Sequence, residues 1–222
     1  MKNYWKPISY LSSILLLLIL ITVFVWHEYF MTDSFFTPAI TLTTDTAFHF
    51  PIYPIYLQND PRWKDDKIGG SQETMGEVGC FVSGISMALA HHGIDLNPKL
   101  LNELLKANDG YTKQGWVKWQ AVSKITYHKV GFHVPSQPRF AVIDAALEAG
   151  EPILAKIRLS GRFPHWVLIV GKAGQDYLVK DPLGDGESLD KLSKFNSKIY
   201  AIRVVKKIET EAGINSYFTP KG

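Results

Sequence analysis

The chain has 222 residues, of which 46% are hydrophobic and 20% charged, with a formal net charge of +3 at pH 7. This length suffices for an anchor and one domain with its own core, and so small a charge gives no argument for a nucleic-acid partner. The single cysteine excludes an intramolecular disulfide. In an oxidising compartment such a thiol is either buried and inert or kept for chemistry.

Residues 8–26, close to the N-terminus, form an uncharged stretch that is predicted to be a transmembrane anchor. About 20 apolar residues in a helix span a bilayer. Lys2 and Lys6 precede the stretch and acidic residues follow it, so the positive-inside rule places residues 1–7 in the cytoplasm and the rest of the chain outside. Bulky residues after the stretch give no cleavage motif, which favours an uncleaved anchor over the alternative, secretion after signal cleavage.

The remaining elements follow from turn residues and hydrophobic periods. Residues 27–50 are rich in threonine and are predicted to be a stalk, and residues 51–58 an extended entry strand at a sheet edge. Helices are expected at 80–92, 97–107, 116–127 and 140–149, and strands at 152–159, 165–171, 177–181 and 199–206. Helices followed by an antiparallel sheet indicate an α+β domain over 51–207, and the polar tail 208–222 is expected to be loosely ordered.

Cys80 begins the first of these helices, directly after Gly79. A thiol is a nucleophile only as its thiolate, and the free N–H groups and the dipole of a helix N-terminus stabilise an anion. Cys80 is therefore a candidate nucleophile. By itself, a cysteine among apolar residues is more often a small core side chain.

Three polar residues can complete a thiol-catalysis layout. His165 opens one strand and Asp181 closes the next, 16 positions later, a separation that suits a hairpin. The imidazole can accept or hold the thiol proton, and the carboxylate can fix its tautomer. Gln58, at the end of the entry strand, is the candidate side-chain donor to an oxyanion. Each residue alone is ordinary, and the prediction depends on their joint order.

These residues carry a resemblance. The segments 58–63, 79–80, 165–171 and 181–182 resemble those of papain-like cysteine peptidases of the bacteriocin-processing (double-glycine leader) type, in its stand-alone branch. The resemblance implies a papain-like α+β fold with Cys80 as nucleophile, His165 as base and acid, and Asp181 as orienting group. It implies Gln58 as oxyanion donor. Gly79 before the thiol and Phe81-Val82 after it depart from the transporter-linked members, which puts the substrate in question.

The expected protein is thus a membrane-anchored cysteine peptidase that acts on a peptide or protein substrate and needs no metal or organic cofactor. Two alternatives stay open: acyl transfer from the same thiol to an amine or thiol, and a non-catalytic, membrane-tethered peptide-binding module. Trp166 and Trp116 are candidate substrate-binding residues, although core packing explains Trp116 or Trp119 equally well. The pair His91-His92 is expected to bond carbonyl groups at a helix end.

Overall fold

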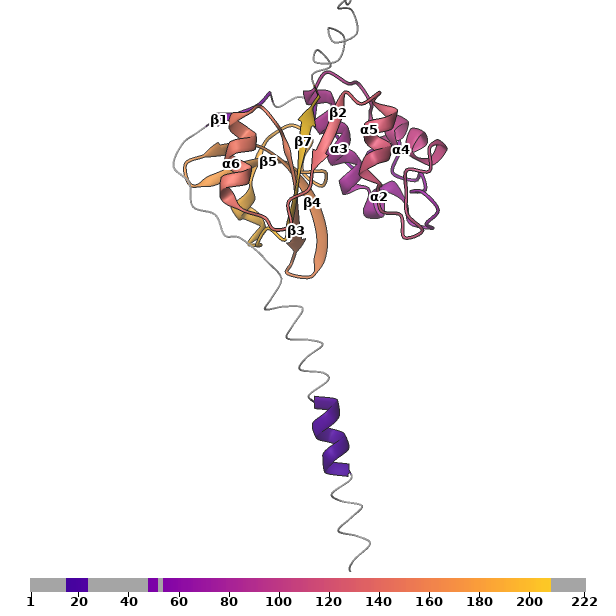
Figure 1. The fold of residues 1–222 in the computed structure, drawn as a ribbon, viewed down its shortest axis with the longest axis vertical. Coiled ribbons are helices and arrows are strands. Elements are labelled where there is room, and N and C mark those ends of the chain that lie inside the picture. The colour runs from indigo at the N-terminus through magenta and orange to yellow at the C-terminus, as the bar shows by residue number, and fades with distance from the viewer. Residues whose placement is uncertain (1–14, 24–47, 52–53, 209–222) are drawn as a thin grey trace, which may run out of the picture. The chain divides into compact units, whose positions relative to one another are not determined.

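The computed structural model describes residues 15–23, 48–51 and 54–208 (Figure 1). The chain divides into two units, Met1–Pro38 and Ala39–Gly222. In the first unit, residues 15–23 are helical and exposed. Among the residues described, no helix is both long and apolar enough to cross a bilayer. The rest of the predicted anchor at 8–26, residues 1–7, most of the stalk and nearly all of the tail lie outside the described residues.

The second unit has the predicted α+β class, with most of its helices preceding an antiparallel sheet. The helices are α2 (Met75–Val78), α3 (Cys80–His91), α4 (Pro98–Ala107), α5 (Trp119–Ile125), α6 (Phe140–Glu148) and the 3-10 helix η1 (Leu192–Phe195). The strands are β1 (Phe48–His49), β2 (Val130–His133), β3 (Ile153–Leu159), β4 (Phe163–Ala173), β5 (Asp176–Lys180), β6 (Asp190–Lys191) and β7 (Ala201–Lys207).

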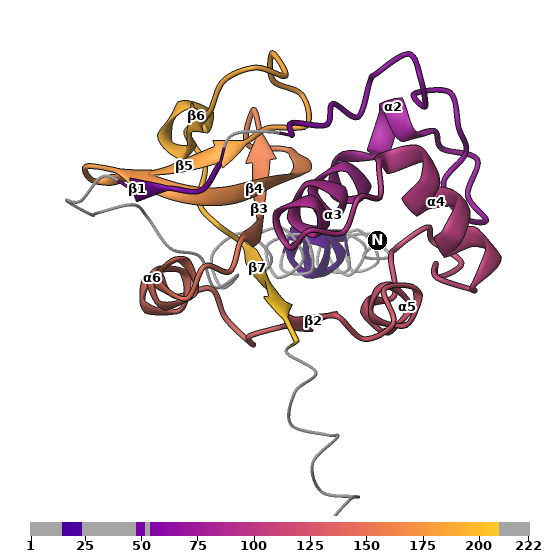
Figure 2. The same ribbon diagram turned by 90° about the horizontal axis from the view of Figure 1, so that it is seen from above.

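The sheet runs in the order β2-β7-β3-β4-β5-β6, and β1 pairs with the far end of β4. Every pairing is antiparallel, and β3 and β4 form a hairpin in which Ile157 lies opposite His165. Because successive side chains of a strand point to opposite faces, His165 and Trp166 lie on different faces of β4. Figure 2 shows α2, α4 and α5 gathered beyond α3 on one side of the sheet, with α6 on the other.

Helix α3 joins the helical half of the domain to the sheet. Most of its side chains are small or apolar, and all but Phe81, Ala90 and His91 are buried. Gly84 allows close packing, since a Cβ there would lie 2.6 Å from Leu154 Cδ2 of β3. A helix that is apolar around most of its circumference must be covered on most sides. Here the sheet and the neighbouring helices cover it, which fixes the position of its first residue.

Several predicted elements differ from the structure. Residues 54–58 form no strand. Backbone hydrogen bonds join the chain to the sheet region before and at the end of this segment, from Phe50 N–H to Val170 O and from Gln58 N–H to Pro182 O. Residues 48–49, expected to belong to the stalk, form β1. The helix expected over 116–127 is the shorter α5, while α2, β2, β6 and η1 were not expected.

Candidate active site

The turn between α2 and α3 places Cys80 at the first position of α3. The N–H of Gly79 donates to Met75 O at 2.8 Å, and a Cβ on Gly79 would lie 2.3 Å from that same oxygen. Only glycine fits this turn without a shift of the backbone. Cys80 is buried, with 7% of its surface exposed. Its sulfur therefore sits at the N-terminus of a fixed helix, where free N–H groups favour an anion.

Glu77 is the acidic residue nearest to Cys80 in sequence on the N-terminal side, and its carboxylate is bound at the N-terminus of α2. Its Oε2 accepts hydrogen bonds from the N–H and the hydroxyl of Thr74, at 2.8 and 3.0 Å. These bonds lower the pKa of Glu77, with that from the Thr74 backbone contributing most. The carboxylate thus caps α2.

His165 and Asp181 form a buried pair. Nε2 of His165 lies 2.7 Å from Oδ1 of Asp181, and the two residues are 2% and 5% exposed. Asp181 Oδ1 also accepts the Leu183 N–H at 2.9 Å, and Lys194 Nζ lies 3.9 Å from Oδ2. Because Nε2 is bound to Asp181, Nδ1 is the ring nitrogen left to face Cys80. The structure thus brings together the three residues that the sequence singled out.

Their mutual interactions favour the charged forms. Burial lowers the pKa of His165, but the hydrogen bonds with Asp181 and Cys80 and the charges of both outweigh burial and raise it to about 9. Burial would raise the pKa of Asp181, yet the hydrogen bonds from His165 and Leu183 bring it below its ordinary value, helped by the charges of His165 and Lys194. An imidazolium beside a carboxylate results at neutral pH.

Gln58 is buried, at 3% exposed, and is tied to the helix before Cys80. Its Nε2 donates to the carbonyl of Gly76 at 2.7 Å. The amide group has a second N–H on the same nitrogen, and its Oε1 has no partner among the described residues. A buried amide oxygen without a hydrogen bond costs about 1–3 kcal/mol, and the second N–H of the same amide is the group that could donate to a ligand.

Trp166 is half-buried and belongs to an aromatic cluster beside the pair. Its ring meets Phe81 edge-on at a centroid distance of 4.8 Å, and Phe81 meets Trp119 in the same way at 4.9 Å. Arg203 places its guanidinium 5.2 Å from the Trp119 ring and 5.6 Å from the Trp166 ring. Phe81 and Trp166 directly follow Cys80 and His165, so this packing holds both segments in place.

Trp116 lies apart from this cluster, on the loop before α5. Its side chain is 71% exposed, and of the two tryptophans considered for core packing it is Trp119 that packs against the core. The loop is closed by backbone hydrogen bonds between Thr112 and Trp116 and between Thr112 and Gly115. A substrate contact by Trp116 stays a prediction.

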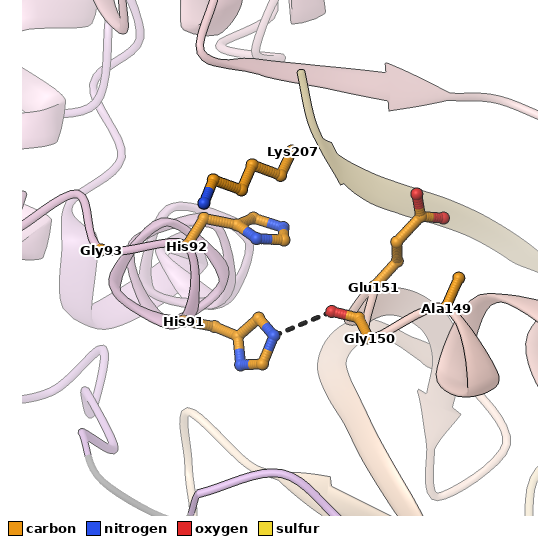
Figure 3. A pocket seen from close by; sticks show the side chains of 7 residues that line it. All are labelled: His91, His92, Gly93, Ala149, Gly150, Glu151 and Lys207. Atoms are coloured by element: carbon orange, nitrogen blue, oxygen red, sulfur yellow. Dashed lines mark hydrogen bonds between the residues drawn. The ribbon is translucent and has the colours of Figure 1, made fainter. Parts of the chain in front are cut away.

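The far end of α3 carries a second polar site. His91 Nε2 bonds the carbonyl of Gly150 at 2.9 Å, and His92 Nε2 bonds that of Val205 at 2.8 Å. With Lys207 and Glu151 they line a concavity of about 580 Å³ (Figure 3). Burial lowers the pKa of both histidines. The pair was expected to bond carbonyls at the helix end, but the carbonyls that it bonds belong to other segments, so both imidazoles fasten α3 to its surroundings.

Two features of the site were not expected from the sequence. Lys194 reaches Asp181 from η1, 13 positions later, and Arg203 reaches the two tryptophans from β7. Neither carries a local sequence signal, because each contact depends on how the strands pair. No group of three or more His, Cys, Asp or Glu side chains comes together to hold a metal ion within the described part of the chain.

The arrangement supplies the parts of nucleophilic catalysis by a thiol: a sulfur at a helix start, an imidazole, an orienting carboxylate and an amide donor.

No protein-family model matches the chain. Over 107 residues, 48% of this chain, it is 28% identical to the mesentericin transport/processing ATP-binding protein MesD of Leuconostoc mesenteroides. The chain spans 14% of the length of that relative. Among solved structures, it is similar to a C39-like peptidase from Bacillus anthracis, with 17% identity, a TM-score of 0.42, and coverage of 70% of this chain and 99% of the other.

Proposed function

We propose that this chain is a papain-like cysteine peptidase related to the bacteriocin-processing peptidases, hydrolysing peptide or amide bonds through Cys80, His165, Asp181 and Gln58. The observation that carries the proposal is the buried His165–Asp181 pair, at 2.7 Å, whose imidazole interacts with the Cys80 thiol at the start of α3. The sequence similarity to a transport/processing protein supports the same class of reaction. A non-catalytic binding module would not need this combination of a thiol, an imidazole, a carboxylate and an amide.

The reaction has two halves. With the thiol proton already on His165, the Cys80 thiolate attacks the carbonyl carbon, forming a C–S bond while the carbonyl π electrons move to oxygen. The second N–H of Gln58 and the Cys80 backbone N–H donate to that oxyanion. The oxyanion collapses as the C–N bond breaks, and His165 gives its proton to the leaving amine.

Water then completes the hydrolysis. His165, now neutral, takes a proton from a water molecule, whose oxygen attacks the acyl-thioester carbon. The C–S bond breaks, the acid product leaves, and the thiolate–imidazolium pair is restored. Asp181 keeps the imidazole in one orientation throughout and balances its charge. Trp166 lies beside the site and is proposed, with Trp116, to contact the substrate.

The proposal also includes the location. Residues 8–26 are a single-pass tether with residues 1–7 in the cytoplasm and the peptidase outside, supported by the uncharged length of the stretch and the lysines before it. A peptide or protein near the membrane is the substrate class. Acyl transfer to an amine uses the same first half of the reaction, and product analysis with an added amine separates the two outcomes.

The first experiment is alkylation of Cys80 by iodoacetamide across pH 4 to 9, on the full chain in detergent, comparing wild type with His165→Ala. A thiolate–imidazolium pair predicts fast labelling below pH 7 that collapses in the variant. Labelling that rises only near pH 8.5, the ordinary thiol value, and that ignores His165 contradicts the proposal. Since Cys80 is the only cysteine, the label reports on this site alone.

A further inference from the structure

Two segments of this chain carry lysines and arginines without any acidic residue: residues 191–208, which have six, and the segment around α5. Residues 111–143 contain five lysines and arginines and no aspartate or glutamate. The chain as a whole has a net charge of +3, so all other residues together carry a net charge of −2. Charge patterning of this kind marks a surface that meets an anionic partner.

Helix α5 sits in the middle of this segment, at the outer boundary of the helical half (Figure 2). Its exposed side chains, Gln120 and Lys124, are four positions apart and so lie on one face of the helix. Trp116 lies in the loop three positions before the helix, and Tyr127 lies in the turn two positions after it. We name these residues, with the exposed Lys113 and Lys129, the α5 stripe.

The two aromatic side chains of the α5 stripe are unusually exposed. Trp116 is 71% exposed and Tyr127 is 86% exposed, although both are large and apolar enough to be buried. Tyr127 and His128 both have positive φ angles, of 52° and 59°, a conformation that costs a residue with a Cβ. The turn is closed by hydrogen bonds from Tyr127 N–H to Lys124 O and from His128 N–H to Ser123 O, which hold Tyr127 outward.

The lysines of the α5 stripe are also available to a partner. Lys113, Lys124 and Lys129 are exposed, and none of them is in an ion pair with another described residue. Lys118, in contrast, is paired with Asp109 at 2.7 Å and is left out of the stripe. Among the described residues, three exposed lysines without an ion pair thus accompany two exposed aromatic rings on and around α5.

We infer that the α5 stripe docks on the surface of an anionic lipid bilayer. Tryptophan and tyrosine are the residues enriched at the membrane interface, and lysines near the surface are attracted to anionic headgroups. A helix presenting its outer face is convex and suits a flat surface, whereas an acidic peptide partner would call for a groove. The inference concerns a surface of the peptidase unit and does not depend on the chemistry of Cys80. It assigns Trp116 to the membrane in place of the substrate contact proposed above.

Lysine acetylation footprinting of the full chain tests this inference. The chain is bound to nanodiscs of phosphatidylcholine alone, or of phosphatidylcholine mixed equally with phosphatidylglycerol. Docking predicts that Lys113, Lys124 and Lys129 are acetylated at least about threefold more slowly on the anionic discs, because each lysine near such a surface gains about fivefold in association. Lys99 and Lys191, which are exposed on α4 and β6, keep the same rate on both discs.

Two variants sharpen the test. Trp116→Ser with Tyr127→Ser, and separately Lys124→Glu with Lys129→Glu, are expected to abolish the protection of Lys113. The charge-matched control, Lys99→Glu with Lys191→Glu, is expected to leave it intact. Equal acetylation on both kinds of disc, or protection of Lys99 and Lys191 to the same degree, overturns the inference. An acidic protein as the true partner gives the first of these results.

Discussion

Nε2 of His165 lies 2.7 Å from Oδ1 of Asp181, with both side chains buried. A buried charge left without its partner is far more costly than the pair itself. Asp181→Asn keeps the shape of the side chain but removes its charge. We expect it to lower the free energy of unfolding by about 3 kcal/mol and to slow alkylation of Cys80 below pH 7, measured by urea denaturation and by labelling.

Asp190→Asn is the matched control for this prediction. Lys194, which also lies near Asp181, forms an ion pair with Asp190 at 2.5 Å. Both members of this pair are more exposed than His165 and Asp181. Exposed ion pairs contribute about 0–1 kcal/mol, so this variant should be close to wild type in both measurements. Equal effects of the two substitutions would show that the burial of the His165–Asp181 pair is unimportant.

The pKa of His165 predicts how stability depends on pH. It is raised from 6.5 to about 9 in the folded chain. A group with a raised pKa stabilises the fold fully below its unfolded value, and this contribution is lost as pH rises through the folded value. The free energy of unfolding should therefore fall between pH 6.5 and 9, by on the order of 3 kcal/mol. Denaturation across this range checks it.

His165→Gln provides the comparison, because an amide does not titrate. In that variant the loss of stability over pH 6.5 to 9 should be much smaller. A wild-type stability that stays level or increases over the same range would contradict the raised pKa.

Gln58 can be tested by separating two reactions of the same thiol. Alkylation by iodoacetamide passes through no oxyanion, whereas peptide hydrolysis does. Gln58→Leu should therefore leave labelling of Cys80 nearly unchanged while lowering kcat by about 10²–10³, the usual cost of one oxyanion donor. Parallel loss of labelling would mean that Gln58 instead maintains the structure around the thiol, through its hydrogen bond to Gly76 O.

Gly79 is predicted to be intolerant of substitution. In Gly79→Ala the new Cβ would lie 2.3 Å from Met75 O, a backbone atom that cannot move without opening the α2–α3 turn. We expect a loss of about 1–3 kcal/mol in thermal or urea unfolding, together with slower labelling of Cys80. Gly70→Ala is the control, because a Cβ at Gly70 meets nothing within 4 Å. A wild-type labelling rate in Gly79→Ala would show that the turn does not position the thiol.

Much of the fold could be predicted because its signals are local. The leucine spacing after Asn97 and the helix-capping bond from Leu100 N–H to the Asn97 side chain belong to a single segment, α4. The short apolar runs of β3 and β4 also show in the sequence. The same local reasoning singled out Cys80, His165 and Asp181; the pairing of β4 with β5 brings the last two together, and the packing of α3 on the sheet brings Cys80 to them.

The elements that were missed depend on distant partners. β2 contains Gly131 and shows little alternation, and it exists through pairing with β7, more than 70 positions later. The entry segment looked like a strand because its side chains are apolar, yet Pro51 and Pro54 have no N–H to donate. The exposure of Trp116 could not be distinguished from the burial of Trp119, since both lie in one short aromatic stretch.

The pairing of β1 with β4 changes where the peptidase unit can be cut from the chain. Phe50 is 7% exposed, and its ring stacks on His91 at 4.5 Å, beside the place where β1 crosses Gly171. A Cβ at Gly171 would lie 2.1 Å from Phe48 O, so the β4 backbone is shaped to receive this strand. An expression fragment starting at residue 51 would discard the strand and uncover the end of α3, whereas one starting before Phe48 retains both.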